Sequence, residues 1–295
     1  MTGELAALGS ALAFGVSTVL ARRFMEAIPP ESGVLVSIVT NVVVFTALAA
    51  IAAARGVLPP IHPASIPLFI LGGAAGTLLG RNLSYLSLEM LGAPLSTTIR
   101  LSTVAFTLLF GLMFLKELPR AWQLVGLATI SAGLWICLWS RERAAGTMAR
   151  RTKLASGLLL ALAGAAGFAL GDTVRRGALA LTPAPVLGAA VGACTALLGH
   201  LTWSRFHSSA RWPGAQALRR PDLLGSAVCN TIAILLLFVA LRHSPVAIVS
   251  VLYNLQVLVV FMISPLLLRG QDGITLWLVV GAALALAGTT MILMG

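Results

Sequence analysis

Long apolar runs, separated by short polar breaks, occupy almost the whole chain and constrain its fold more than any other feature. About ten such runs occur, over residues 5–24, 33–54, 65–88, 93–115, 120–139, 154–175, 184–203, 222–241, 245–268 and 274–294. Each is close to the roughly 20 apolar residues that an α-helix needs to cross a bilayer. Of the 295 residues, 58% are hydrophobic and only 10% are charged, whereas a soluble domain is about 25% charged. The sequence therefore predicts an all-α membrane protein with about ten transmembrane helices.

Prolines mark most of the breaks between these runs. Pro30, Pro94, Pro119 and Pro245 stand at or beside expected helix starts, where the missing N–H of proline has no helical partner in any case. Pro265 lies late in the ninth run and predicts a kink in that helix. Glycines recur at helical spacing in the third, sixth and seventh runs, which indicates seams of close helix packing rather than ligand binding.

The two halves of the chain resemble each other. A tryptophan followed by two glycines occurs at the same spacing in the fifth and tenth runs, as Trp122, Gly126 and Gly133 and as Trp277, Gly281 and Gly288. At nearly the same shift, Phe14 in the first run matches Phe168 in the sixth. The predicted organisation is a five-helix repeat over 3–140, a linker loop over 141–153 and a second five-helix repeat over 154–294. Because five is odd, the second repeat enters the membrane from the opposite side, which makes two inverted repeats of the kind found in alternating-access carriers.

With this architecture, the chain resembles the EamA-like carriers of the drug/metabolite transporter (DMT) superfamily. The resemblance rests on short segments taken in order, over residues 11–17, 112–117, 123–133 and 168–171. The family usually has tryptophan where Phe14 and Phe168 stand, and the Lys116–Glu117 pair of the first half becomes Gln271–Asp272 in the second. The resemblance implies export or exchange of small metabolites, amino acids or drugs.

The function expected is that of a secondary carrier rather than an enzyme. The sequence holds no His-Glu pair at helical spacing, no paired aspartates and no Gly-x-Ser-x-Gly that could build a hydrolytic site, and no phosphate-binding Gly-x-x-x-x-Gly-Lys-Ser/Thr loop for ATP. Cys137, Cys194 and Cys229 are far apart and match no metal or redox spacing. We therefore expect no catalytic residues, no metal and no cofactor. A non-catalytic subunit or channel, or an exporter of cationic or drug-like compounds, remains the alternative.

Two arginines within apolar runs suggest where a substrate binds. Arg81 and Arg100 lie about as far before and after the turn near Gly92, roughly 14 Å deep at about 1.5 Å per residue. An arginine at that depth costs at least ~2.5 kcal/mol, so each needs a partner or a wet cavity. One interpretation is that both snorkel or bond to backbone carbonyls; the other is that they clamp a carboxylate or phosphate of an anionic or zwitterionic metabolite.

Four further polar side chains are expected to complete this substrate-binding pocket: Tyr85, Tyr253, Asn254 and Gln256. Asp172 is the one carboxylate well inside an apolar run, but Arg175 and Arg176 lie about one helical turn on. An ion pair with either would hold Asp172 ionised. We therefore predict a structural role for Asp172 rather than proton coupling.

The formal net charge of +11 does not indicate nucleic-acid binding, because the basic residues sit mainly at the ends of apolar runs, where they face lipid headgroups. Connections after odd-numbered helices hold twelve basic residues and the other connections hold six. Since positive charge prefers the cytoplasm, this count favours both termini outside, whereas the resemblance implies both inside. The expected partners are a small-molecule substrate and the lipid bilayer of the cell (inner) membrane, with a homodimer left open.

Overall fold

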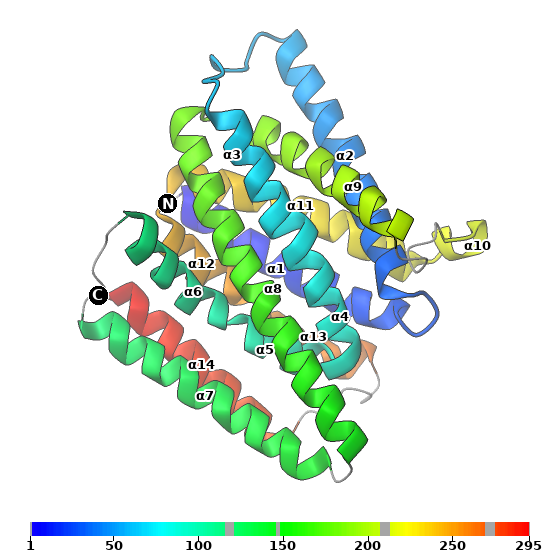
Figure 1. The fold of residues 1–295 in the computed structure, drawn as a ribbon, viewed down its shortest axis with the longest axis vertical. Helices are drawn as coiled ribbons and strands as arrows, with labels where there is room; N and C mark the ends of the chain where they lie inside the picture. The colour runs from blue at the N-terminus through cyan, green and yellow to red at the C-terminus, as the bar shows by residue number, and fades with distance from the viewer. Residues whose placement is uncertain (1, 116–120, 146–147, 207–212, 269–274, 295) are drawn as a thin grey trace.

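The computed structural model describes residues 2–115, 121–145, 148–206, 213–268 and 275–294, and within these ranges the chain is almost entirely helical and contains no strand (Figure 1). The first half comprises α1 (Thr2–Phe24), α2 (Pro30–Ala54), α3 (Ser65–Gly72), the π-helix η1 (Gly73–Gly80), α4 (Arg81–Leu91), α5 (Ala93–Arg100), α6 (Ser102–Phe110), the π-helix η2 (Gly111–Leu115) and α7 (Ala121–Ala145). The second comprises α8 (Met148–Leu181), α9 (Pro185–Phe206), the short α10 (Ala215–Leu218), α11 (Pro221–His243), α12 (Val246–Asn254), α13 (Gln256–Leu267) and α14 (Leu276–Met294).

These elements make the predicted set of membrane spans. Among the described residues, nine helical segments are long and apolar enough to cross a bilayer, and the tenth, over Leu276–Met291, is a shorter apolar helix. Several elements join into one span: α3, η1 and α4 form the third, α5, α6 and η2 the fourth, and α12 and α13 the ninth. The prediction of an all-α membrane protein is confirmed.

The segment 141–153, expected as a linker loop, is instead largely helical. The helix α7 continues to Ala145 and α8 begins at Met148, leaving only 146–147 outside the described residues. Alanine, arginine, glutamate and lysine are good helix formers, so a polar composition shows where the chain leaves the hydrocarbon and not where its helix ends.

Helices four and nine are interrupted at equivalent places. Leu101 N–H bonds to the Thr98 carbonyl at 3.0 Å, and Leu255 N–H bonds to the Leu252 carbonyl at 3.2 Å, both i→i+3 bonds of the 3₁₀ type. The sequence predicts a kink at Pro265, but the interruption in the ninth span lies ten residues earlier, and α13 continues through Pro265 to Leu267. The sequence feature that signals a kink is therefore not what divides this span.

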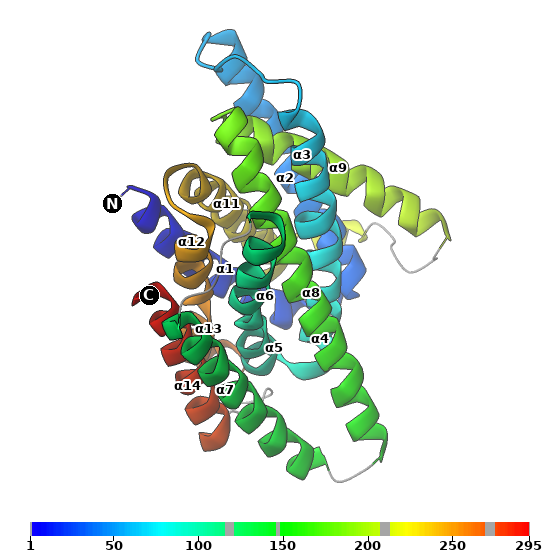
Figure 2. The ribbon, with the colours of Figure 1, turned by 60° about the vertical axis from the view of Figure 1, so that its left-hand side comes forward.

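The two halves pack on each other in exchanged pairs. The helix α1 of the first half packs on α11, α12 and α13, and its counterpart α8 packs on α3, η1, α4, α5 and α6. The pairs α2–α9 and α7–α14 join equivalent helices, and α7 and α14 lie side by side in both views of the ribbon (Figures 1 and 2). This exchange is what a two-fold relation between two five-helix repeats requires.

Glycines of the repeated Trp–Gly pattern form the contact between α7 and α14. A Cβ atom built on Gly133 would lie 2.5 Å from the carbonyl oxygen of Gly281, and one on Gly288 would lie 2.5 Å from that of Gly126. No real side chain tolerates such a distance, so only glycine allows these backbones to meet. The packing seams predicted from the sequence lie in other helices, where a Cβ atom on Gly73 of the third span would lie 2.6 Å from the Cα atom of Gly192 in the seventh, which confirms that prediction.

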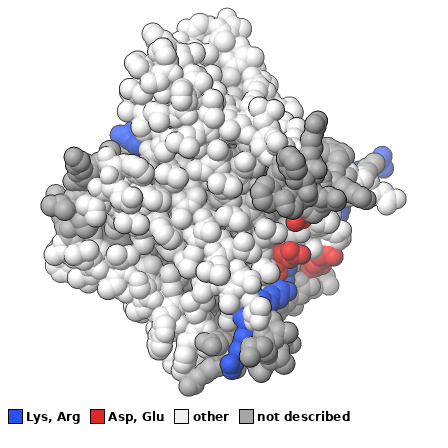
Figure 3. All heavy atoms as spheres, viewed as in Figure 1, with Lys and Arg blue, Asp and Glu red and all other residues white. Residues whose placement is uncertain are grey.

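The outside of the bundle is apolar. Figure 3 shows a face that is almost free of charged atoms; most of those present lie toward its right and lower right, and one basic group stands at the upper left. Large side chains stand exposed along several helices, among them Leu159 at 68%, Leu198 at 68% and Met262 at 74%. A soluble protein seldom exposes so continuous an apolar surface. The chain is a multi-pass integral membrane protein.

Candidate functional site

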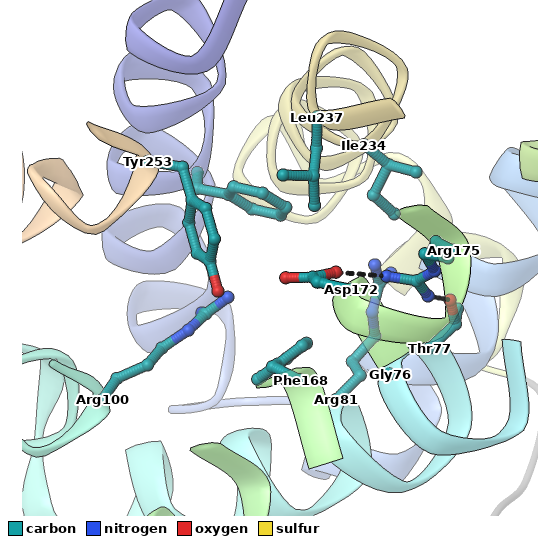
Figure 4. Close-up of a pocket in the computed structure, with 11 residues that line it drawn as sticks. Gly76, Thr77, Arg81, Arg100, Phe168, Asp172, Arg175, Ile234, Leu237 and Tyr253 are labelled. Atoms are coloured by element: carbon teal, nitrogen blue, oxygen red, sulfur yellow. Dashed lines mark hydrogen bonds and ion pairs between the residues drawn. The ribbon is translucent and has the colours of Figure 1, made fainter. Parts of the chain in front are cut away.

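A narrow cavity lies between the two halves, and its wall combines charged and aromatic side chains (Figure 4). The described residues that line it are Phe14 of α1, Gly76 and Thr77 of η1, Arg81 of α4, Arg100 of α5, Phe168, Asp172 and Arg175 of α8, Ile234 and Leu237 of α11, and Tyr253 of α12. The volume open to water is about 10 Å³, which is room for about one water molecule. The site is therefore too narrow for a metabolite in this conformation.

An ion pair fixes one side of the cavity. Arg175 donates from Nη1 to Asp172 Oδ1 at 2.9 Å and from Nη2 to Thr77 Oγ1 at 2.7 Å, so it links α8 to η1. Asp172 is 2% exposed and Arg175 is 4% exposed. The second carboxylate oxygen, Asp172 Oδ2, has no hydrogen-bond partner among the described residues and points into the cavity in Figure 4.

Of the two pairings that the sequence left open for Asp172, the structure selects Arg175. The other neighbour, Arg176, donates instead to the carbonyl oxygens of Leu241 and Arg242, at 2.6 and 3.0 Å. It thereby satisfies the C-terminal end of α11, whose last carbonyls have no partner within the helix.

Arg81 enters the cavity at the junction of η1 and α4. A π-helical stretch widens the helix and turns the residues that follow it, and such stretches are frequent at functional sites. Arg81 is 4% exposed, and its Nη1 donates to Ser37 Oγ of α2 at 2.7 Å. This bond holds the guanidinium in place and leaves other N–H groups of the side chain for a ligand.

Arg100 is held mainly by aromatic rings. Its Cζ lies 4.2 Å from the ring centre of Phe168 and 5.4 Å from that of Phe14, both within cation–π range. These two phenylalanines are the equivalent residues of helices one and six, so each repeat contributes one ring. Arg100 Nε has no hydrogen-bond partner among the described residues, and the hydroxyl of Tyr253 points into the same space in Figure 4.

The charges around the cavity do not balance. Three arginines, Arg81, Arg100 and Arg175, face one aspartate, Asp172, among its described lining residues, a formal excess of two positive charges. An unbalanced charge in an apolar interior costs several kcal/mol. An anionic group bound between these side chains would reduce the imbalance.

Three of the six residues predicted for the substrate pocket, Arg81, Arg100 and Tyr253, line this cavity, and Tyr85, Asn254 and Gln256 do not. Tyr85 lies one turn beyond Arg81, where its ring packs 6.3 Å from that of Phe24. Asn254 follows Tyr253 in the helix, so its side chain points in a different direction, and its Nδ2 donates to the Ser250 carbonyl at 2.7 Å. Gln256 lies beyond the interruption at Leu255 and is fully buried.

Eight other lining residues were not expected in the site from the sequence, among them Phe14, Thr77, Phe168, Asp172 and Arg175. Two signals were present in the chain. The first and sixth helices carry Phe14 and Phe168 at matching positions, and Asp172 is the one carboxylate deep in an apolar run. Thr77 carries no such signal, because its role depends on which helix packs against η1.

Comparisons with known proteins agree with this architecture. The sequence model of the EamA-like transporter family matches residues 1–139 and again residues 155–294. One solved structure, described only as "Crystal structure of protein", superposes with a TM-score of 0.65 at 17% identity, over 96% of this chain and 94% of that chain; at that identity the likeness shows the fold alone. No curated protein matches the chain. Since the two family matches cover nearly the whole sequence, the chain belongs to the EamA-like transporter family.

Proposed function

We propose that this transporter is a secondary carrier that moves a small anionic or zwitterionic metabolite by alternating access between its two inverted repeats. The excess of two positive charges in the cavity between the halves carries the proposal. A planar guanidinium suits bidentate contact with a carboxylate or phosphate, and Arg81 and Arg100 each keep N–H groups that no described residue accepts.

One observation favours a zwitterionic substrate over a simple anion. Asp172 Oδ2 faces the cavity without a hydrogen-bond partner among the described residues, and an ammonium group would satisfy it. A substrate that carries both charges would then place its anion on the arginines and its amine on Asp172. This arrangement leaves fewer buried polar groups unpaired than a simple anion would.

The size of the cavity supports an alternating-access cycle. With room for about one water molecule, it admits a metabolite only if the halves move apart, and such opening is a common step of carriers. No ATP-binding loop occurs in the sequence, so the cycle runs on a gradient or on exchange.

Counterflow in proteoliposomes tests the proposed function. Vesicles containing the purified protein and one of a panel of small carboxylates, phosphates or amino acids are expected to take up the labelled compound saturably, and faster when the unlabelled compound is inside. A channel would show uptake without this acceleration. If organic cations are exchanged and no anion or zwitterion is, the assignment of the site is wrong.

We further propose that both termini lie outside, because connections after odd-numbered helices carry twelve basic residues against five in the others once Arg175, which lines the cavity, is left out. In a variant without Cys137, Cys194 and Cys229, single cysteines are placed at Val57, after helix two, and at Gly214, after helix seven; both positions are exposed. An impermeant thiol reagent applied to intact cells is expected to label the cysteine at 57 and not the one at 214. The reverse pattern would show that the termini are inside.

A further inference from the structure

A second cavity opens on the outside of the bundle, where α7 ends and α8 begins. Its volume is about 340 Å³, against about 10 Å³ for the cavity between the halves, and falls within the range of small-ligand sites. The α7 wall consists of Trp135, Leu138 and Trp139, and the α8 wall includes Arg151, Leu154 and Leu158. None of these residues belongs to the site between the halves.

The wall of this outer cavity is apolar except for one cation. Arg151 is exposed, and none of the described lining residues is acidic. The segment 141–153 around it carries five basic residues, Arg141, Arg143, Arg150, Arg151 and Lys153, against the single acidic Glu142. The ligand that complements such a wall has a negative charge at one end and an apolar body.

The position along the helices places the mouth of this cavity at headgroup level. The apolar span of α7 ends at Ser140 and that of α8 begins at Arg151. Trp135 and Trp139 stack with ring centres 6.3 Å apart, and Trp139 meets Trp277 of α14 edge-on at 5.9 Å. Tryptophans gathered at the end of a span are typical of the membrane–water interface, so Arg151 lies near the phosphates and Leu158 nearer the acyl chains.

We propose that the outer cavity binds one anionic phospholipid, with its phosphate beside Arg151 and an acyl chain along Leu154 and Leu158. The cavity opens on the apolar surface that lipid covers, which favours a lipid over a soluble phosphate compound. Basic pockets between membrane helices are known to hold anionic headgroups. This site does not depend on the proposed transport function.

Native mass spectrometry of the full chain in detergent tests the proposal by titration with phosphatidylglycerol and phosphatidylcholine of equal chain length. The first phosphatidylglycerol is expected to bind about fivefold more tightly than phosphatidylcholine, which is the effect of one arginine near an anionic headgroup. Arg151→Gln removes the charge, and Ala155→Phe fills the cavity from an exposed position of its wall. Each is expected to abolish the preference, whereas Arg55→Gln, at an exposed arginine outside the cavity, leaves it unchanged.

Three outcomes would overturn the site. In the first, the preference for phosphatidylglycerol survives in both Arg151→Gln and Ala155→Phe. In the second, Arg55→Gln removes this preference equally, which would mean a diffuse effect of positive charge. In the third, excess glycerol phosphate displaces the lipid, which would identify a soluble phosphate ligand. All three variants change exposed residues, and unchanged thermal midpoints in lipid-free detergent verify that they fold.

Discussion

Replacing Arg100 with glutamine is expected to weaken binding of an anionic substrate by about 10- to 100-fold, because a hydrogen bond to a charged group contributes about 1.5–3 kcal/mol. Of the three cavity arginines, Arg100 makes the fewest hydrogen bonds to described residues. Arg81 bonds to Ser37 and Arg175 bonds to both Asp172 and Thr77, whereas Arg100 rests on the rings of Phe14 and Phe168. The variant should therefore fold, and the loss should appear in substrate affinity.

The measurement is the concentration dependence of counterflow by Arg100→Gln in proteoliposomes, with the thermal midpoint in detergent as a check on folding. Two tyrosines give a matched control. Tyr253→Phe removes a hydroxyl that lines the cavity, while Tyr85→Phe removes one that does not. We expect Tyr253→Phe to weaken binding by a smaller factor than Arg100→Gln and Tyr85→Phe to leave it unchanged. Unaltered affinity in Arg100→Gln would refute the assignment of this arginine.

The contrast between the two tyrosines shows where sequence reasoning about the site stops. Distance from the turn at Gly92 was enough to place Arg81 and Arg100 at one depth, because rise per residue is constant in a helix. The same reasoning puts Tyr85 next to Arg81, yet the cavity ends at Arg81 and Tyr85 packs on Phe24. The depth of a residue in the membrane follows from its position along a helix, whereas the limits of a cavity depend on which side chains of other helices fill the space.

The fold was easier to predict, because each span must supply about 20 apolar residues and satisfy its own backbone. The Trp–Gly pattern revealed the repeat. Its glycines recur in both halves because they bring α7 and α14 into contact. The interruptions at Leu101 and Leu255 carry no such signal. Both are leucines in apolar sequence, and the proline that signals a kink, Pro265, stands elsewhere.

Asp172→Asn is expected to lower the stability of the folded protein more than any other single change in the cavity. Asp172 and Arg175 are both almost fully buried, and removing one partner of a buried pair costs about 3–5 kcal/mol. Without this carboxylate, three arginines would line the cavity with no described acidic residue to offset them. The expected result is a sharply reduced yield and a lower thermal midpoint in detergent.

The pair between Arg220 and Asp222 provides the control. Its arginine side chain is 35% exposed, although that of Asp222 is only 7% exposed. Because water screens one partner of this pair, and the Asp172–Arg175 pair is buried on both sides, Asp222→Asn should reduce the midpoint less. A second comparison tests the mechanism directly. If the unpaired guanidinium causes the loss, adding Arg175→Gln to Asp172→Asn should restore part of the stability, although it also removes the bond to Thr77.

The same variant distinguishes a structural aspartate from a proton carrier. One oxygen of Asp172 is bound to Arg175 at 2.9 Å, so a proton taken up by Asp172 would cost this buried ion pair. Its other oxygen faces the cavity and has no hydrogen-bond partner among the described residues, so it is available to a substrate amine. We therefore expect transport by the folded fraction of the Asp172→Asn protein to depend on pH as it does in the unchanged protein. A normal yield with loss of pH-driven uptake would instead make Asp172 the coupling group.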